Sequence, residues 1–198
     1  MTILLPALVL CLRGFAAQPQ HLRLDITVQN AGALPAFIVT AIEEAAYIWA
    51  AYGVDVRLNA HDAEHDADVR IAVRIAPSAN PHSETGVLGA IVFEGDAPEP
   101  AIALYPAAAS ALMAAVASSR REDSWPAAPH DRVLARVLGR ALAHEIGHFL
   151  LRSKIHSAGG LMRAQQTATD LMSPGHRGFV LTADEVRRLR ANLPAAKG

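Results

Sequence analysis

The segment from Arg132 to Leu151 constrains the fold of this chain more than any other, because it predicts a long amphipathic helix with ionisable side chains on its apolar face. On a helical wheel, His144, Glu145 and His148 share an arc with the aliphatic side chains of the segment. Ionisable groups that face a core are costly unless they have partners, and a bound divalent cation supplies a partner. The helix therefore predicts a metal site on its buried face. The opposite arc, which we expect to face solvent, holds Arg132, Arg136 and Arg140.

The two histidines belong to the pattern His-Glu-Ile-Gly-His at residues 144–148. Because positions i and i+4 lie one turn apart on one face of a helix, both imidazoles can reach the same ion. Glu145 points to the neighbouring side, close to that ion but not bound to it, where its carboxylate can take a proton from a water on the metal. The pattern predicts metal-assisted hydrolysis with Glu145 as the base. The alternative is a helix whose histidines and glutamate reach solvent at the edge of a sheet.

A catalytic zinc ion is held by three protein ligands and keeps a fourth position for water, so the pattern lacks one ligand. His156, eight positions after His148, is the next histidine and the first candidate. Asp170 or Glu185 would instead give a site with two histidines and one carboxylate, and His176 is a further candidate. The residues alone leave these alternatives open.

The run from His144 to Met162, HEIGHFLLRSKIHSAGGLM, resembles the signature of the metzincin superfamily of zinc peptidases. That signature has a histidine-glutamate-x-x-histidine helix, a third histidine, and a later methionine in a tight turn beneath the metal. His156 is similar to the third histidine, and the two glycines before Leu161 permit the tight turn. Met172 is a second candidate for the methionine of that turn.

The resemblance implies a zinc metallopeptidase with Zn²⁺ as its cofactor and a peptide or protein as its substrate. It implies that His144, His148 and His156 bind the zinc. It also implies that Glu145 is the catalytic residue, which deprotonates the water and passes the proton to the leaving amine. The alternative function is a non-catalytic zinc-containing binding protein with a metzincin-like fold, in which a fourth protein ligand would replace the water.

The sequence departs from the metzincin pattern at two positions. The glycine that usually follows the second histidine by three positions is Leu151, and the third histidine that usually follows it by six is Lys154. A lysine cannot replace that histidine, because its ammonium group repels zinc. Reaching His156 therefore requires either about half a turn more of helix or a bulged loop. No tyrosine stands in this segment to stabilise an oxyanion, which leaves the zinc itself, Arg163 or His176 for that role.

Hydrophobic periodicity predicts an α/β (α+β) fold with a mixed sheet. The resemblance adds a twisted sheet of about five strands, an active-site helix, a small C-terminal subdomain, and an antiparallel edge strand near residues 87–93 that borders the cleft. Strands are expected at Leu22–Val28, Val54–Leu58, Val69–Ile75, Val87–Phe93 and Ile102–Tyr105. Helices are expected at Leu34–Tyr52, Ala107–Ser118, Arg132–Leu151 and Ala183–Asn192, and an irregular segment at Arg152–Arg177.

The N-terminal run from Ile3 to Leu12 is apolar but too short to span a bilayer. It is typical of a signal-peptide core, and the small residues Gly14 and Ala16 match a cleavage site. We therefore expect residues 1–17 to be a signal peptide and residues 18–198 to form a single catalytic domain. The alternative is a buried first element of the mature fold. A real signal would place the protein outside the cytoplasm, secreted or periplasmic, and its absence would leave it cytoplasmic.

Composition excludes several classes of protein. Hydrophobic residues make up 52% of the chain, which is enough for a core and excludes a disordered chain. The chain has 18 basic and 19 acidic residues without a dense basic stripe, so we expect no nucleic-acid partner. Cys11 is the only cysteine, which excludes an intrachain disulfide and leaves histidines and carboxylates as zinc ligands. Two polar segments, His61–Asp68 and Ser83–Thr85, are expected to be loops.

Overall fold

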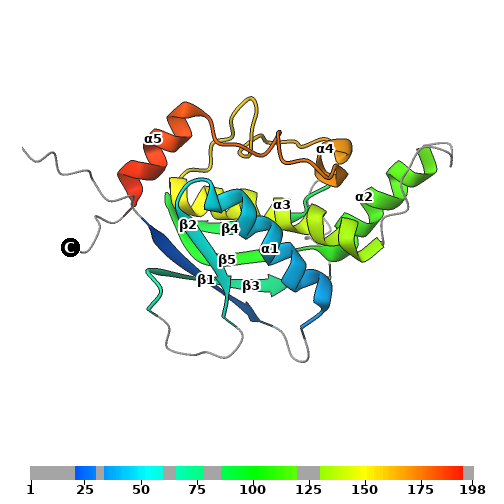
Figure 1. Cartoon of the computed structure of the whole chain (residues 1–198), viewed down its shortest axis with the longest axis horizontal. Helices are drawn as coiled ribbons and strands as arrows, with labels where there is room; N and C mark the ends of the chain where they lie inside the picture. The colour runs from blue at the N-terminus through cyan, green and yellow to red at the C-terminus, as the bar shows by residue number, and fades with distance from the viewer. Residues whose placement is uncertain (1–20, 30–33, 60–65, 78–85, 120–129, 194–198) are drawn as a thin grey trace, which may run out of the picture.

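The computed structural model describes residues 21–29, 34–59, 66–77, 86–119 and 130–193 (Figure 1). The predicted signal peptide at 1–17, most of the predicted loop at 61–68 and the polar residues 83–85 lie outside the described residues, so secretion stays a prediction. Within the described part of the chain, no helix combines the length and the apolar character that a membrane crossing requires.

The chain forms one mixed sheet of five strands, in the order β2-β1-β3-β5-β4. The pairs β1–β2, β1–β3 and β3–β5 are parallel, whereas β4 runs antiparallel to β5 at the edge of the sheet. This arrangement confirms the predicted α/β fold with a mixed sheet, and it confirms the antiparallel edge strand. The strands span Leu22–Gln29 (β1), Val54–Leu58 (β2), Val69–Ile75 (β3), Gly89–Glu94 (β4) and Ala97–Leu104 (β5).

The prediction for the last strand was wrong at its start, because β5 begins at Ala97 and not at Ile102. The missed part of the strand contains Pro98 and Pro100, and proline has no N–H to donate to a ladder. In the structure, β5 pairs with β3 only from Ala101 onward, and Pro98 pairs with β4 alone. The first half of β5 therefore has one free side, where proline is tolerated. With β4 it forms a hairpin that extends past β3.

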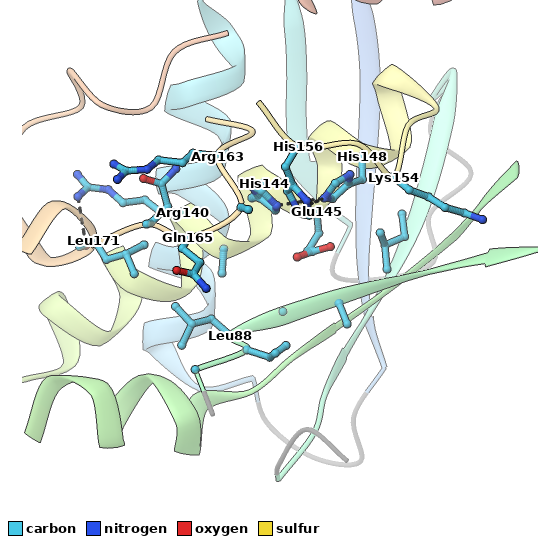
Figure 2. Close-up of a pocket in the computed structure, with 18 of the residues that line it drawn as sticks. Leu88, Arg140, His144, Glu145, His148, Lys154, His156, Arg163, Gln165 and Leu171 are labelled. Atoms are coloured by element: carbon cyan, nitrogen blue, oxygen red, sulfur yellow. Dashed lines mark hydrogen bonds between the residues drawn. The ribbon is translucent and has the colours of Figure 1, made fainter. Parts of the chain in front are cut away.

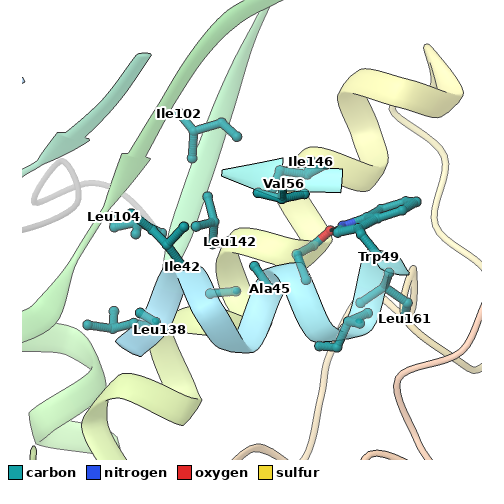
Figure 3. Close-up of a cluster of buried hydrophobic side chains, with 14 of the residues drawn as sticks. Ile42, Ala45, Trp49, Val56, Ile102, Leu104, Leu138, Leu142, Ile146 and Leu161 are labelled. Carbon is teal, nitrogen blue, oxygen red and sulfur yellow. Dashed lines mark hydrogen bonds between the residues drawn. The ribbon is translucent and has the colours of Figure 1, made fainter. Parts of the chain in front are cut away.

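Two long helices, α1 (Ala36–Ala50) and α3 (His130–Leu151), pack together on one face of the sheet (Figures 1 and 3). A Cβ built on Gly139 of α3 would lie 2.5 Å from the carbonyl oxygen of Ala41, so the two helices approach closely there. Trp49 of α1 is fully buried, and its indole N–H donates to the carbonyl oxygen of Ala143 at 3.0 Å. The contact between the helices fixes the position of α3 over the sheet. The buried residues of α1 are Ile38, Ala41, Ile42, Ala45, Ile48 and Trp49.

The C-terminal part of the chain runs over α1 and α3 on the side away from the sheet (Figure 1). It contains α5 (Ala183–Asn192), whose predicted capping box between Thr182 and Glu185 is present. The segment that we expected to be irregular also holds a short helix, α4 (Ala168–Met172), which is capped by the Thr167 hydroxyl. Five residues are too few for a periodic apolar pattern, which explains why the sequence did not predict this helix. The remaining helix is α2 (Pro106–Ser119).

Arg140 is buried, at 1% exposed, although the helical wheel placed it on the solvent-facing arc. The C-terminal segment covers that arc of α3 and surrounds the guanidinium. Its Nε donates to Glu44 Oε1 at 2.9 Å, and its two terminal nitrogens donate to the carbonyl oxygens of Leu171 at 3.1 Å and Gly175 at 2.8 Å. The ring of Phe179 lies 4.3 Å from the guanidinium carbon. Helix α3 is therefore enclosed between the sheet and the C-terminal segment.

Candidate metal centre

Three histidine side chains converge beside the last turns of α3 (Figure 2). The Nε2 atom of His148 lies 3.1 Å from that of His144 and 3.2 Å from that of His156. Two nitrogens that bind one tetrahedral zinc at about 2.0–2.1 Å lie roughly 3.3 Å apart, so the spacing fits a single small ion. Among the described residues, these three form the group of potential ligand residues that could hold a metal.

Backbone carbonyls orient two of the three imidazole rings. Nδ1 of His144 lies 2.8 Å from the carbonyl oxygen of Leu161, and Nδ1 of His148 lies 2.6 Å from that of Ser153. A carbonyl oxygen can only accept, so each Nδ1 carries the proton and each Nε2 presents its lone pair. Lone pairs that face each other at this distance repel unless a cation lies between them. The donor set therefore fits a metal ion, with the second ring nitrogen held as is usual for histidine ligands.

Burial keeps these imidazoles in the neutral form that a metal ion requires. Desolvation lowers the pKa of His144 to about 4, even though the hydrogen bond to Leu161 opposes the shift. Desolvation also lowers the pKa of His148, against the opposing effect of the bond to Ser153. Both side chains are thus unprotonated at neutral pH, and their nitrogens are available as ligands.

The loop after α3 brings His156 back to the metal centre. Helix α3 ends at Leu151, and Arg152 adopts a left-handed conformation with φ 48°, which reverses the chain. The N–H of Ser153 then donates to the carbonyl oxygen of His148 at 3.2 Å. Of the two routes to His156 that the sequence allowed, the structure shows the loop and not a longer helix. The His156 ring lies nearly parallel to that of His144, with 16° between the planes.

The other candidate ligands lie elsewhere in the described structure. The carboxylate of Asp170 accepts a hydrogen bond from the Thr167 hydroxyl at 2.7 Å, and the carboxylate of Glu185 accepts one from the backbone of Thr182 at 2.7 Å. His176 contacts α1 instead, where its Nε2 lies 3.1 Å from a carboxylate oxygen of Glu44 and its ring centroid lies 4.3 Å from that of Tyr47. None of the three belongs to the histidine cluster. The position of His176 also removes it from the predicted role of stabilising an oxyanion.

Met162 packs beneath the turn of α3 that carries the histidines. It is 1% exposed, and a Cβ on Gly147 would overlap its sulfur atom. Met162 ends a tight turn of residues 157–162, which is closed by a hydrogen bond from the N–H of Ser157 to the carbonyl oxygen of Met162 at 2.9 Å. Gly160 adopts φ 77° within this turn. Met172 lies in α4 instead, so Met162 occupies the predicted position under the site. Arg163 follows Met162, but its guanidinium points away from the histidines (Figure 2).

Glu145 lies between the histidines and the edge strand β4 (Figure 2). Its side chain is buried, and desolvation raises its pKa to about 7, while a hydrogen bond from the backbone of Ile91 opposes the shift. Gly89 leaves room for it, because a Cβ at that position would lie 3.1 Å from Cγ of Glu145. The sequence predicted Glu145 but not these two neighbours, which lie in an ordinary apolar strand and have no local pattern of their own.

Glu145 and the three histidines line a cavity of roughly 650 Å³. The edge strand β4 forms one wall, and the chain after Met162 forms the opposite wall. Apolar side chains line the cavity beside Glu145, namely Leu88, Ile91, Leu112, Ala141 and Leu171. The Glu145 carboxylate and the histidine cluster thus share one cavity with the edge strand β4.

No family model matches the sequence, and no curated protein sequence matches it. The fold is similar to that of the crystal structure of archaemetzincin from Methanopyrus kandleri, with a TM-score of 0.52 and 12% identity over 93% of this chain and 99% of that one. A metalloproteinase-II structure from Bacteroides fragilis has a TM-score of 0.48 and 14% identity, over 90% of this chain and 54% of that one. The first likeness shows that the fold is metzincin-like.

Proposed function

We propose that the protein is a zinc-dependent peptidase and that His144, His148 and His156 bind the zinc. The observation that carries the proposal is the convergence of three imidazole Nε2 atoms beside the Glu145 carboxylate in one cavity. Three neutral histidines are a known ligand set for catalytic zinc, and they leave a fourth position free. When bound, the ion supplies Lewis acidity, which acidifies a water molecule and polarises a carbonyl group.

Glu145 is suited to move the proton in this reaction. Burial raises its pKa to about 7 without a metal, and a nearby cation favours the charged carboxylate. The ionised side chain accepts a proton from the attacking water, and the buried, protonated side chain then delivers it to the leaving amine. The hydrogen bond from Ile91 holds the carboxylate at the strand edge, where the peptide carbonyl would lie.

The edge of β4 is suited to hold an extended peptide. β4 is the outermost strand of the described sheet and pairs with β5 on one side only. A peptide can add to such an edge through main-chain hydrogen bonds, which bind it irrespective of its side chains. Glu145 borders this strand, so a peptide on β4 has its backbone next to the base. This geometry favours a peptide over a small amide as the substrate.

The test is hydrolysis of a denatured protein by the zinc-loaded chain and by its Glu145→Gln variant. We expect the variant to keep its zinc and to lose activity by about 100-fold or more, because the general base is gone but the ligands remain. Full activity of the variant would contradict the mechanism. Bound zinc without hydrolysis by the wild-type protein would instead support the non-catalytic binding protein.

A further inference from the structure

Lys154 crosses the turn between β4 and β5, at one end of the cleft. Its ammonium group donates to the carbonyl oxygen of Gly95 and lies 3.7 Å from the carboxylate of Asp96. It also lies 5.2 Å from the ring centroid of Phe93, which meets the His148 ring edge-on. Lys154 is therefore close to the metal centre without belonging to it. Figure 2 shows it on the opposite side of the histidines from Gln165 and Leu171.

Cationic side chains outnumber carboxylates among the described residues that line the cleft. Glu145 is the one carboxylate among the described lining residues. Arg140 also lines the cleft, but its charge is compensated by Glu44. Lys154 and Arg163 remain as cationic groups that a ligand could meet. A ligand with negative charge is complementary to this lining.

The ion pair between Lys154 and Asp96 is weak, so another carboxylate can take the place of Asp96. The side chain of Lys154 is 53% exposed and that of Asp96 is fully exposed. Ion pairs between exposed side chains contribute little to stability, because water screens both charges. A carboxylate of a bound peptide can therefore replace Asp96 at small cost. The carbonyl of Gly95 and the ring of Phe93 would still hold the lysine in place.

The distance along β4 defines which residue of a peptide meets Lys154. Ile91 contacts Glu145 and marks the position of the reacting bond. Phe93 lies two residues further along the strand, a distance of about 7 Å in a regular strand, and the pairing of β4 with β5 shifts in register between the two residues. A peptide extended along β4 thus presents its second or third residue from the reacting bond to Lys154. Antiparallel pairing places that residue on the N-terminal side of the bond, and parallel pairing places it on the C-terminal side.

We propose that Lys154 makes this cleft selective for peptides with an acidic side chain two or three residues from the scissile bond. The position of the scissile bond rests on the proposed peptidase function, but the preference in binding does not need hydrolysis. Lys154 is a specificity residue in this account and plays no part in the chemical step. Its place two residues before His156 gives the loop a second role besides carrying a zinc ligand.

The experiment measures binding of short labelled peptides to the zinc-loaded Glu145→Gln protein by fluorescence anisotropy. The peptides differ only in glutamate, glutamine or lysine at the second or third position on either side of a central bond. We expect the glutamate peptides of one side to bind about three- to tenfold more tightly, with the difference shrinking at high salt. Lys154→Met should abolish the preference, Lys154→Arg should keep it, and Lys154→Glu should reverse it toward lysine-containing peptides.

Two controls separate selectivity from damage to the site. Zinc content should be unchanged in all Lys154 variants, and Arg188→Met, which removes an exposed charge from α5, should leave the preference intact. Equal binding of glutamate and glutamine peptides by the Lys154-containing protein would overturn the proposal, as would a preference that survives Lys154→Met. If the Glu145→Gln protein prefers acidic peptides but the zinc-loaded wild type hydrolyses neither them nor a denatured protein, the peptidase function is refuted and the role of Lys154 stands.

Discussion

The sulfur atom of Met162 occupies the space that a Cβ on Gly147 would need. Gly147 is the residue before His148 in the helix, and Met162 is buried beneath the same turn. The glycine in the His-Glu-Ile-Gly-His pattern is therefore a packing requirement of this chain. Met162 packs against the turn of α3 that carries the histidines and is not one of the proposed zinc ligands.

Gly147→Ala should destabilise the protein, because the new methyl group forces Met162 or the helix to move. We expect a loss of about 1–3 kcal/mol in the free energy of unfolding, measured by urea denaturation, together with weaker zinc binding. Gly159→Ala is the matched control, since a Cβ at Gly159 meets nothing within 4 Å. A Gly147→Ala protein as stable as the Gly159→Ala protein would show that the packing is not tight.

Arg140→Met should lower the free energy of unfolding by more than the substitution of an exposed arginine does. The change leaves Glu44 without its charged partner and leaves the carbonyl oxygens of Leu171 and Gly175 without a donor. Loss of one partner from a buried pair costs about 3–5 kcal/mol in unfolding free energy. Arg132→Met, at an exposed position on the same helix, should change it by less than about 0.5 kcal/mol. Equal effects of the two substitutions would contradict the buried network.

The metal-free Glu145→Gln protein should gain stability over the metal-free wild type at pH 8. Burial raises the folded-state pKa of Glu145 from 4.5 to about 7, so at pH 8 the wild type buries an ionised carboxylate. As the pH falls from about 7 towards 4.5, the folded state takes up this proton before the unfolded state does, and the wild type gains stability. The difference between the two proteins should therefore shrink over that window.

Comparing the two proteins cancels the effect of the histidines on stability, because protonation of His144 and His148 changes the free energy of unfolding of both proteins in the same way. The measurement is urea unfolding with a chelator present, at a series of pH values. A stability difference that is constant between pH 8 and pH 4.5 would show that Glu145 is not buried as described.

Local patterns in the sequence predicted most of the sheet and the core of the site. The spacing of His144 and His148 on one helix determines that they share a face, so their approach needs no knowledge of the fold. His156 was more difficult, since its place depends on the left-handed turn at Arg152, which no local pattern indicates. The carbonyl groups of Ser153 and Leu161 that orient the imidazoles could not be predicted, because backbone atoms carry no sequence signal.

The errors arise where distant segments meet. A helical wheel gives the faces of one helix but not what covers them, so Arg140 was assigned to solvent although residues 170–179 enclose it. The first half of β5 was missed because it contains two prolines, and the sequence does not show that β3 pairs with β5 only from Ala101 onward. Both errors concern tertiary packing, and the resemblance of residues 144–162 to the metzincin pattern did not extend to either region.

The zinc content of the purified protein decides whether the three histidines form a zinc site, with wild type, His156→Ala and His130→Ala measured side by side by mass spectrometry. His130 lies exposed at the start of α3 and controls for the loss of a histidine outside the cluster. The account predicts stoichiometric zinc in the wild type and in His130→Ala, and a marked loss in His156→Ala. A wild-type protein that binds no zinc, or a His156→Ala protein that retains it fully, would contradict the three-histidine site.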